Sequence, residues 1–196
     1  MLKTKIAVFV SGGGTNFEAL INAQENGKIP HGEIVLMVSS SKTAYALKRA
    51  ENHGIKSVVC SKKELGSQES FEEEILKNLE ENDIQLIVLA GFMSILSKEF
   101  TKKYENRIIN IHPSLIPSFC GEGFYGLHVH EAALKKGVKV TGATVHIVNE
   151  IPDGGPIIMQ RAVYVEENDT PEILQKRVME QAEWKILPES VELMCS

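Results

Sequence analysis

The sequence has few cysteines and no long apolar run. Its three cysteines, Cys60, Cys120 and Cys195, are odd in number, widely spaced and include no Cys-x-x-Cys pair. This usage excludes a disulfide framework, argues against a structural zinc site and indicates a reducing, cytoplasmic compartment. The longest apolar stretch, residues 84–96, is broken by polar residues and is shorter than the roughly 18 residues that span a bilayer. The run at 6–10 is too short for a secretory signal, so we expect a soluble protein.

Aspartate and net positive charge are also scarce. Only three of the 26 acidic residues are aspartates, Asp83, Asp153 and Asp169. Asp83 and Asp169 have the positions of turn or helix-end residues, which leaves Asp153 as the candidate for chemistry. The 21 basic residues give a net charge of -5, so neither nucleic acid nor an anionic membrane is expected as a partner. Any anionic ligand must therefore be held by local groups.

Short β-branched runs alternate with longer amphipathic segments over the first ninety residues, which is typical of βαβ units. With 43% hydrophobic and 24% charged residues, the chain fits one compact domain over residues 1–196. We predict an α/β fold, in which a doubly wound, mostly parallel sheet ends in an antiparallel C-terminal portion.

The boundaries of the predicted elements follow from the apolar periods and the caps. In the helix expected at 69–82, Ser70 and Glu73 have the spacing of a capping box. The last helix begins after Thr170, with Pro171 at its first position. Strands are predicted at 5–10, 33–39, 56–60, 85–90, 107–112, 139–148 and 156–165, and the other helices at 16–26, 43–53, 97–103 and 128–137.

A glycine-rich loop follows the first predicted strand. Residues 11–16 read Ser-Gly-Gly-Gly-Thr-Asn, and they lie where backbone amides at a helix N-terminus can bind an anion. The spacing fits neither the dinucleotide fingerprint nor the Walker pattern, so a phosphomonoester is favoured over ATP or a dinucleotide. The alternative is a tight turn capped by Thr15 or Asn16.

A second group of polar residues follows the strand at 107–112. Alternation along that strand places Asn110 and His112 on one face, at its carboxyl end. Far along the chain, the turn at 151–156 fixes the backbone around Asp153. An aspartate beside a histidine raises the imidazole pKa, and an asparagine amide can donate to an oxyanion. Together these residues suit acyl transfer, although each alone could be an ordinary turn or strand-end residue.

The sequence also contains possible nucleophiles and metal ligands, but their sequence context does not fit those roles. Ser114 and Cys120 are the only nearby nucleophiles, and neither lies in a Gly-x-Ser-x-Gly elbow, so direct attack by a substrate amine is favoured. His128 and His130 do not share a helical face, and no metal site is predicted. His146 is expected to pack within its strand or to donate a hydrogen bond behind the site.

Several motifs together identify a family. They are residues 11–16, 89–93 (Leu-Ala-Gly-Phe-Met), 110–117 (Asn-Ile-His-Pro-Ser-Leu-Ile-Pro), 126–128 (Gly-Leu-His) and 153–156 (Asp-Gly-Gly-Pro). This set resembles the phosphoribosylglycinamide formyltransferase family, the folate-dependent enzymes of purine synthesis. The likeness runs from about residue 5 to Pro188. The later motifs mark the wider group of enzymes that use formyltetrahydrofolate, and the glycine loop narrows the likeness to the branch with a ribonucleotide substrate.

The resemblance implies a Rossmann-like, ribonucleotide-binding half over about 1–100, and a folate-binding and catalytic half over about 101–196. The implied catalytic residues are Asn110, His112 and Asp153. The implied ribonucleotide-binding residues are Gly14, Thr15, Asn16, Glu180, Gln181, Ala182 and Glu183. The implied folate-binding residues are Gln68, Met93, Ser94, Ile95, Leu96, Asn149, Glu150, Ile151 and Pro152, together with Asn110 and Asp153.

The chain departs from the family pattern at three places. Ser94 and Gln68 stand where some members carry an arginine, which leaves fewer fixed positive charges near the folate. Between Pro117 and Gly126 the chain has the longer loop 118–125, where shorter members have about three residues. This loop is either a mobile flap over the site or a tolerated surface insertion.

The resemblance implies that a cytoplasmic monomer or homodimer transfers the formyl group of its co-substrate, 10-formyltetrahydrofolate, to the amine of phosphoribosylglycinamide. Attack by the neutral amine gives a tetrahedral intermediate, whose oxyanion would meet Asn110 and protonated His112, and Asp153 would keep that imidazole charged. Two alternatives stay open at this point. One is a hydrolase that releases formate from the same folate, and the other is a non-catalytic folate- or nucleotide-binding module.

Overall fold

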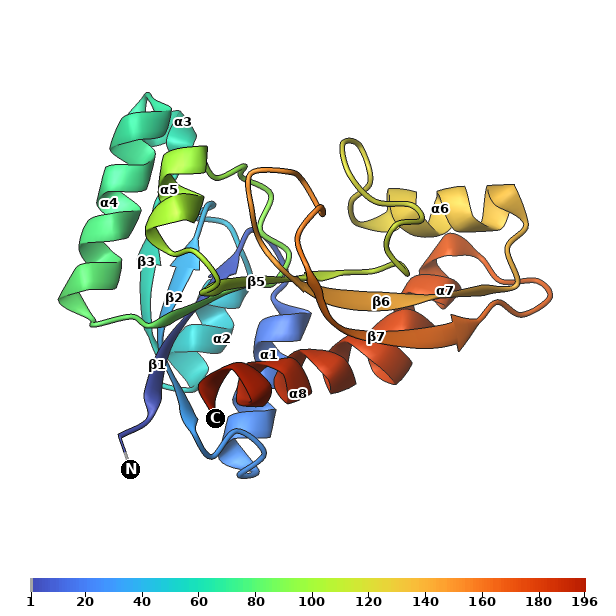
Figure 1. Cartoon of the computed structure of the whole chain (residues 1–196), viewed down its shortest axis with the longest axis horizontal. Helices are drawn as coiled ribbons and strands as arrows, with labels where there is room; N and C mark the ends of the chain where they lie inside the picture. Colours follow the sequence, from blue (N-terminus) through green and yellow to red (C-terminus); the bar gives the residue numbers. More distant parts are fainter. Residues whose placement is uncertain (1) are drawn as a thin grey trace.

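The computed structural model describes residues 2–196, which form a seven-stranded sheet in the order β3-β2-β1-β4-β5-β6-β7 (Figure 1). Strands β1 to β5 pair in parallel, whereas β6 and β7 are antiparallel to their neighbours. The predicted fold class and all seven predicted strands are confirmed, each strand end to within one residue. The strands are β1 Thr4–Val10, β2 Gly32–Ser39, β3 Lys56–Val59, β4 Leu86–Leu89, β5 Ile108–His112, β6 Val140–Ile147 and β7 Ile157–Tyr164.

The helices cover both faces of the sheet. Residues on one side of β1, such as Ile6 and Val8, pack with α1 and α8, and those on the other side, such as Ala7 and Phe9, pack with α4 and α5. Because both faces are buried, the parallel strands lack polar alternation. The helices are α1 Thr15–Glu25, α2 Ala46–Asn52, α3 Lys62–Leu65, α4 Gln68–Glu81, α5 Lys98–Lys103, α6 Leu127–Lys136, α7 Pro171–Val178 and α8 Trp184–Cys195.

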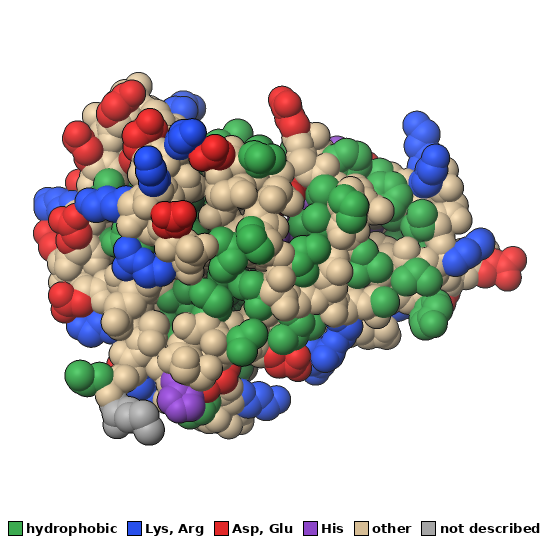
Figure 2. Space-filling model, viewed as in Figure 1, with side chains coloured by type: hydrophobic (Ala, Val, Ile, Leu, Met, Phe, Trp, Pro, Cys, Tyr) green, Lys and Arg blue, Asp and Glu red, His purple; other side chains and the backbone are tan. Residues whose placement is uncertain are grey.

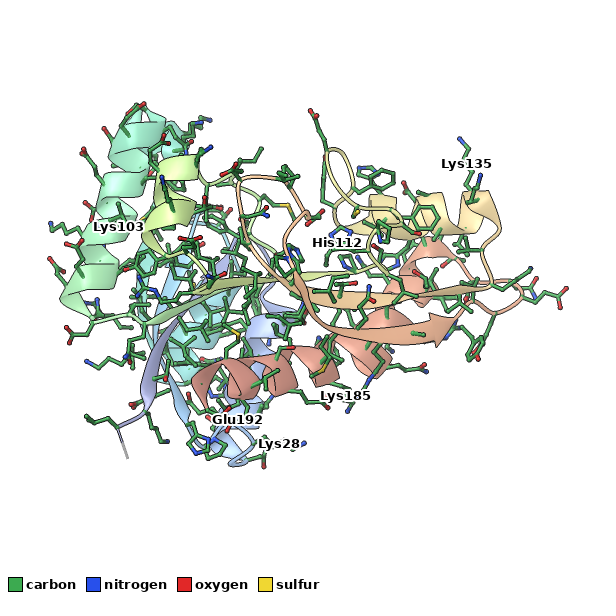
Figure 3. All side chains as sticks on the ribbon, in the orientation of Figure 1. Lys28, Lys103, His112, Lys135, Lys185 and Glu192 are labelled. Carbon is green, nitrogen blue, oxygen red and sulfur yellow. The ribbon has the colours of Figure 1, made fainter. Side chains whose placement is uncertain are left out.

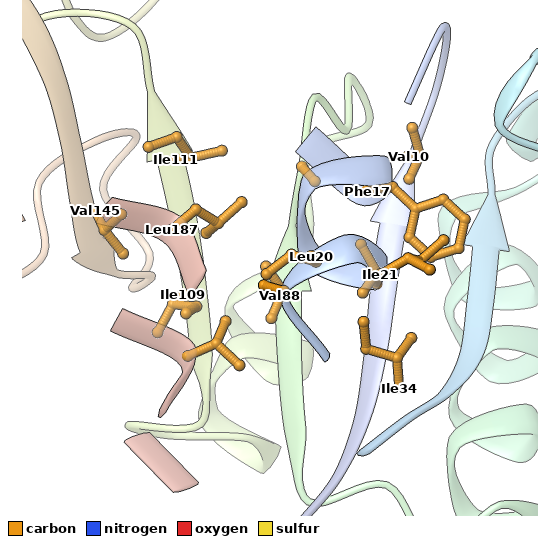
Figure 4. Close-up of a cluster of buried hydrophobic side chains, with 14 of the residues drawn as sticks. Val10, Phe17, Leu20, Ile21, Ile34, Val88, Ile109, Ile111, Val145 and Leu187 are labelled. Atoms are coloured by element: carbon orange, nitrogen blue, oxygen red, sulfur yellow. The ribbon is translucent and has the colours of Figure 1, made fainter. Parts of the chain in front are cut away.

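The larger core cluster packs the first and last helices together on one face of the sheet. Phe17, Leu20 and Ile21 of α1 and Leu187 of α8 are each at most 1% exposed (Figure 4). Burial of a side chain of this size contributes about 1.5–3 kcal/mol. The C-terminal helix is therefore fixed against the same strands that carry the glycine loop.

The order of the strands creates a crevice beside β1. The chain places β2 on one side of β1 and β4 on the other, so the crossovers leave β1 in opposite directions. In open α/β sheets, ligands bind at the carboxyl ends of the strands where the strand order reverses in this way. The loops after β1 and β4 border that point.

Several local predictions need correction. Helix α4 is capped by Ser67, whose hydroxyl accepts from the Ser70 amide at 3.0 Å, so the capping box at Ser70 and Glu73 is wrong. Helix α2 begins at Ala46 and not at 43, because Ser39 and Ser41 hold the preceding residues in a turn. The short helix α3 was not predicted.

The C-terminal helix is interrupted. Thr170 caps α7 as predicted, accepting from the Ile173 amide at 3.3 Å. The turn Met179–Glu183 (η1) then has π-helical geometry before α8 begins. Such a turn accommodates one residue more than an α-helical turn, and it is frequent at functional sites. The single helix predicted from the apolar period is therefore wrong at this turn.

An ion pair joins α7 to the loop between β7 and α7. The guanidinium of Arg177 donates to both carboxylate oxygens of Asp169, at 2.5 and 2.7 Å, and the Asp169 side chain is 3% exposed. Asp169 also accepts from the Glu166 amide at 2.8 Å. Hydrogen bonds from Arg177 lower the pKa of Asp169 below its usual value.

Charged and apolar side chains are unevenly spread on the face drawn in Figure 2. Charged groups gather over α3, α4 and α5, and apolar side chains are more frequent over β6 and β7 (Figure 2). Val140, Ile157 and Tyr164 of these two strands are among the exposed apolar residues. Within residues 2–196, no helix is long and apolar enough to span a membrane.

Candidate active site

The glycine loop turns sharply between β1 and α1. Gly14 has φ 70°, and a Cβ atom there would lie 2.8 Å from the Ala46 Cβ, so only glycine fits. Gly12 and Gly13 border open space. The Ser11 hydroxyl accepts from the Met93 amide at 2.8 Å, which ties the loop to the segment after β4.

A cavity of about 410 Å³ lies in front of this loop; we call it the glycine-loop cavity. It occupies the crevice beside β1, at the N-terminus of α1, where backbone amides favour an anion. Its walls are residues 10–16, Ala90, Gly91, Met93, Gln175 and Met179.

The π turn brings Glu183 against the loop. The Asn16 amide donates to Glu183 Oε2 at 2.5 Å, and the Thr15 hydroxyl lies 3.6 Å from the Met179 sulfur. Burial raises the pKa of Glu183 to about 7, although the Asn16 hydrogen bond opposes the shift. Of the other predicted residues in this turn, Ala182 is buried in the core, and Glu180 and Gln181 are exposed outside the cavity wall.

A second cavity, of about 170 Å³, lies at the carboxyl ends of β4 and β5; we call it the central cavity. Part of its wall is apolar, and its polar end holds Asn110, His146 and Asp153. Most of the predicted folate-binding residues border it. The lining residues are Leu89, Phe92, Ser94, Ile95, Leu96, Thr101, Asn110, His146 and 148–153.

Two predicted folate-binding residues lie elsewhere. Met93 borders the glycine-loop cavity instead. Gln68 donates to Glu72 at 2.5 Å and to the Ile95 carbonyl at 3.1 Å, so it supports the segment after β4 from behind. The two cavities share that segment as a common wall, because Phe92 and Ser94 border one and Met93 borders the other.

Asn110 is held by His146, which the sequence had assigned to packing or to a supporting hydrogen bond. The two residues are direct partners across β5 and β6, and Asn110 Nδ2 lies 3.1 Å from His146 Nε2. His146 Nδ1 lies 2.8 Å from the Ile147 carbonyl, which can only accept. Nδ1 therefore donates to that carbonyl, and Nε2 can accept one of the two hydrogens of the Asn110 side-chain amide.

His112 and Asp153 face each other as predicted. His112 Nδ1 lies 3.6 Å from Asp153 Oδ2, and His146 Nε2 lies 3.4 Å from Asp153 Oδ1. His112 lies between the loop after β5 and the loop after β6 (Figure 3). Burial lowers the pKa of His112, and Asp153 opposes this only in part. The expectation that Asp153 keeps this imidazole charged is therefore wrong for the resting protein.

Asp153 stays ionised although burial favours its neutral form. The nearby His146 and His112 rings and the Gly121 amide outweigh burial and lower the pKa of the carboxyl. Asp153 has φ 54°, a left-handed conformation that is uncommon outside glycine. The Asn149 side chain accepts from the Ile151 amide at 2.9 Å, and a Cβ atom at Gly155 would overlap the Ile147 carbonyl. These contacts fix the turn that aims Asp153.

The loop 118–125 covers His112. His112 Nε2 donates to the Phe119 carbonyl at 2.8 Å, and the Gly121 amide donates to Asp153 Oδ2 at 2.8 Å. Neither candidate nucleophile is activated, because the hydroxyl of Ser114 is held in a hydrogen bond and the thiol of Cys120 is kept protonated. The buried Ser114 hydroxyl donates to the Ser118 carbonyl at 2.6 Å, and burial and Asp153 raise the pKa of the Cys120 thiol.

The other two histidines of this region differ in surroundings. His128 is exposed and pairs with Glu131 at 3.0 Å. His130 is fully buried behind His112 in α6, both its ring nitrogens lack a partner, and burial lowers its pKa to about 4. Among the described residues, no group of three or more His, Cys, Asp or Glu side chains is arranged to hold a metal ion.

The formyl transferase family model matches residues 4–191. The chain belongs to the formyl transferase family. Among curated proteins, this formyl transferase is 46% identical over 99% of its length to the trifunctional purine biosynthetic protein adenosine-3 of Gallus gallus. It is 38% identical over 94% of its length to the phosphoribosylglycinamide formyltransferase of Haemophilus influenzae, and it covers 84% of that protein.

Solved structures are similar as well. The phosphoribosylglycinamide formyltransferase of Brucella melitensis superposes with a TM-score of 0.90 at 41% identity, over 99% of this formyl transferase and 96% of that chain. The predicted family resemblance is thus confirmed. The chain spans only 19% of the Gallus gallus relative and 66% of a chloroplastic relative from Arabidopsis thaliana.

Proposed function

We propose that this formyl transferase moves the formyl group of 10-formyltetrahydrofolate to the amine of phosphoribosylglycinamide, a step of purine synthesis. The observation that carries the proposal is the wall that the glycine-loop cavity and the central cavity share. A cavity suited to a phosphate and a cavity with an apolar wall meet along one segment after β4, and Asn110, His146 and Asp153 stand at the polar end of the second. Two bound substrates would thus meet at these side chains.

The ribonucleotide would occupy the glycine-loop cavity. Gly12 and Gly13 line this cavity at the N-terminus of α1, where their backbone amides would bind the phosphate. Asn16 lines this cavity, and the buried Glu183 carboxyl behind it accepts from the Asn16 side chain, so Glu183 would hold Asn16 in place for the ribonucleotide. Glu180 and Gln181 are exposed and do not line this cavity, so their predicted contact with the ribonucleotide stays a prediction.

The folate would occupy the central cavity. Leu89, Phe92 and Val148 supply apolar surface for a flat ring, and the polar backbone of 149–153 can bind its hydrogen-bonding edge. The folate supplies a formyl group that is activated for transfer. Ile95, Met93 and Ile151 are each more than half exposed around the two cavities and would be covered when both substrates are bound.

Asn110 would have one role in the reaction, and His112 and Asp153 together would have another. The amide hydrogen of Asn110 that is not donated to His146 would stabilise the oxyanion as the amine attacks the formyl carbon. His112 is neutral and Asp153 ionised at rest, so this pair can accept the proton that the amine loses, through water. The same proton then passes to the departing folate nitrogen. The only N–H of the neutral His112 ring, at Nε2, is donated to the Phe119 carbonyl, which leaves the oxyanion to Asn110.

The test mixes the protein with 10-formyltetrahydrofolate, with and without phosphoribosylglycinamide, and follows release of tetrahydrofolate and of formate. Release that requires the ribonucleotide and gives no formate is expected. Equal release without the ribonucleotide would instead make the chain a hydrolase. Binding of both ligands without release would make it a binding module. The Asn110→Ala variant serves as the control for background hydrolysis.

A further inference from the structure

The loop 118–125 is built to hold its backbone in a fixed position. The Ser114 hydroxyl, at the end of β5, donates to the Ser118 carbonyl at 2.6 Å, and the rings of Phe119 and Phe124 pack edge to face with centroids 6.3 Å apart. The Phe124 amide donates to the Gly121 carbonyl at 3.1 Å. Phe119, with φ 50°, and Gly121, with φ 86°, both have left-handed backbone conformations.

These conformations aim two neighbouring backbone groups at the two reacting side chains. The Phe119 carbonyl accepts from His112 Nε2, and the Gly121 amide donates to Asp153 Oδ2, each at 2.8 Å. A carbonyl oxygen stabilises an imidazolium, and an amide hydrogen stabilises a carboxylate. Each contact therefore favours the charged form of its partner, against the burial of both groups.

We propose that residues 118–121 are a positioning segment, which holds His112 and Asp153 face to face and stabilises the ion pair that they form when a proton arrives. In this proposal the longer loop is neither a tolerated surface insertion nor a mobile flap. The Phe119 carbonyl sets the tautomer, because it takes the Nε2 hydrogen and leaves Nδ1 to face Asp153. The consequence for turnover rests on the proposed function, whereas the effect on the two side chains does not.

Other titratable groups face the same pair. His146 of β6 lies 3.4 Å from Asp153, Cys120 of the loop adjoins it, and His130 of α6 lies behind His112. None of these groups takes part in the two backbone hydrogen bonds, from His112 to the Phe119 carbonyl and from the Gly121 amide to Asp153. A variant that moves only the backbone of the loop therefore tests the segment without removing a charge.

The chain offers a matched pair of substitutions for this purpose. Gly121 and Gly123 have φ 86° and 85°, and a Cβ atom at either would meet nothing within 4 Å. Alanine disfavours this backbone conformation equally at both positions. Only the Gly121 amide contacts Asp153, so Gly121→Ala should loosen the segment, and Gly123→Ala is the control.

The readout uses the scarcity of aspartate. Labelling with aspartate that carries ¹³C in its carboxyl group gives signals from only Asp83, Asp153 and Asp169, and Asp153→Asn identifies the signal of Asp153. In the absence of substrates, Gly121→Ala should raise the pKa of Asp153 by about one pH unit, because a hydrogen bond to the charged form is lost. Gly123→Ala should leave this pKa unchanged.

Kinetics provide the second readout. Gly121→Ala should lower kcat about tenfold and move the acid limb of the pH profile upward, with KM for both substrates within about twofold. An unchanged Asp153 pKa, an equal change in both variants, or a rise in kcat would each overturn the proposal. If Gly121→Ala does not fold, an ester bond in place of the Gly121 amide removes the same donor. Absence of formyl transfer in the wild type would contradict the proposed function, and the titration would still decide the positioning role.

Discussion

Asn110 donates one amide hydrogen to His146 and has a second one left for a substrate. If that hydrogen stabilises the oxyanion, Asn110→Ala should lower kcat roughly 100- to 1000-fold. The dissociation constant of the ribonucleotide should change by less than about twofold, because Asn110 does not border the glycine-loop cavity. Steady-state kinetics and calorimetry measure the two quantities. A loss of kcat below about tenfold would remove Asn110 from the mechanism.

Glu183 makes the stability of the fold depend on pH. Its folded pKa of about 7 lies above its ordinary value of 4.5, so the folded protein keeps a proton that the unfolded chain releases between these values. The free energy of unfolding therefore falls as pH rises through this window, and it is level above about pH 7.

Glu183→Gln keeps an acceptor for Asn16 and removes this dependence. Between about pH 4 and about pH 8, the variant should gain up to about 3 kcal/mol relative to wild type, measured by urea unfolding. Glu180→Gln, in the same turn but exposed, is the matched control and should show a constant difference. If the unfolding free energy of the wild type does not fall relative to that of Glu183→Gln as the pH rises, the raised pKa of Glu183 is contradicted.

The pairing of His112 with Asp153 could be predicted from motifs, but the role of His146 could not. His146 reaches Asn110 because β5 and β6 pair antiparallel with these two residues in register. The register between two segments joined by a long connection is set by packing and not by the apolar period of either. The charge of His112 was predicted wrongly for a related reason, since the extent of burial is a property of the folded chain.

At the scale of elements, the glycine loop and the start of α1 border the cavity that is proposed to bind the phosphate. Thr15→Asp places a carboxylate in the wall of that cavity, where it should repel a phosphate. The affinity for the ribonucleotide should fall at least about tenfold in calorimetry. Thr170→Asp adds the same charge, keeps the cap of α7 and should bind as wild type does. Equal affinities of the two variants would contradict a phosphate at the loop.

The contact between Asp169 and Arg177 fixes α7 to the loop that precedes it. Asp169→Asn should destabilise the protein by about 2 kcal/mol at neutral pH, because the mostly buried guanidinium loses its buried, bidentate partner and keeps only the exposed carboxylate of Glu166. Asp83→Asn breaks an ion pair with Lys5 whose aspartate is 80% exposed, and it should cost less than about 1 kcal/mol. Urea unfolding compares the two.

The pH dependence of this contact has the opposite sign to that of Glu183. Because Arg177 lowers the pKa of Asp169, the pair stabilises the fold above the ordinary pKa of 3.8, and the stabilisation is lost as pH falls through the lowered value. The difference between Asp169→Asn and wild type should therefore shrink in acid. A difference that persists in strong acid would show that the side chain contributes by packing alone.

At the scale of the whole molecule, the sheet could be predicted because both faces of its parallel strands are buried, which gives apolar runs at regular intervals. The glycine loop could be predicted because three consecutive glycines have few uses. The π turn was not predicted, because one α-helical period was carried across residues 179–183, and the contacts of the loop 118–125 could not be predicted, because they depend on left-handed residues such as Phe119.

The net charge of -5 has a different meaning once the site is located. Both proposed substrates are anions, yet the glycine-loop cavity offers backbone amides and a helix N-terminus in place of basic side chains. These groups act over short distances, and salt screens the distant carboxylates beyond about 8 Å at physiological ionic strength. An acidic protein can therefore hold a phosphate at one point of its surface.

The π turn also constrains how the chain can change over evolution. Removing one residue from 179–183 would restore a continuous α-helix and rotate everything after it by about 100°. Ile186, Leu187 and Val191 would then leave the core against the sheet, at the same time as Glu183 left Asn16. A deletion that disables the site would thus also unfold the last helix, so the extra residue is retained for the stability of the fold as much as for its chemistry.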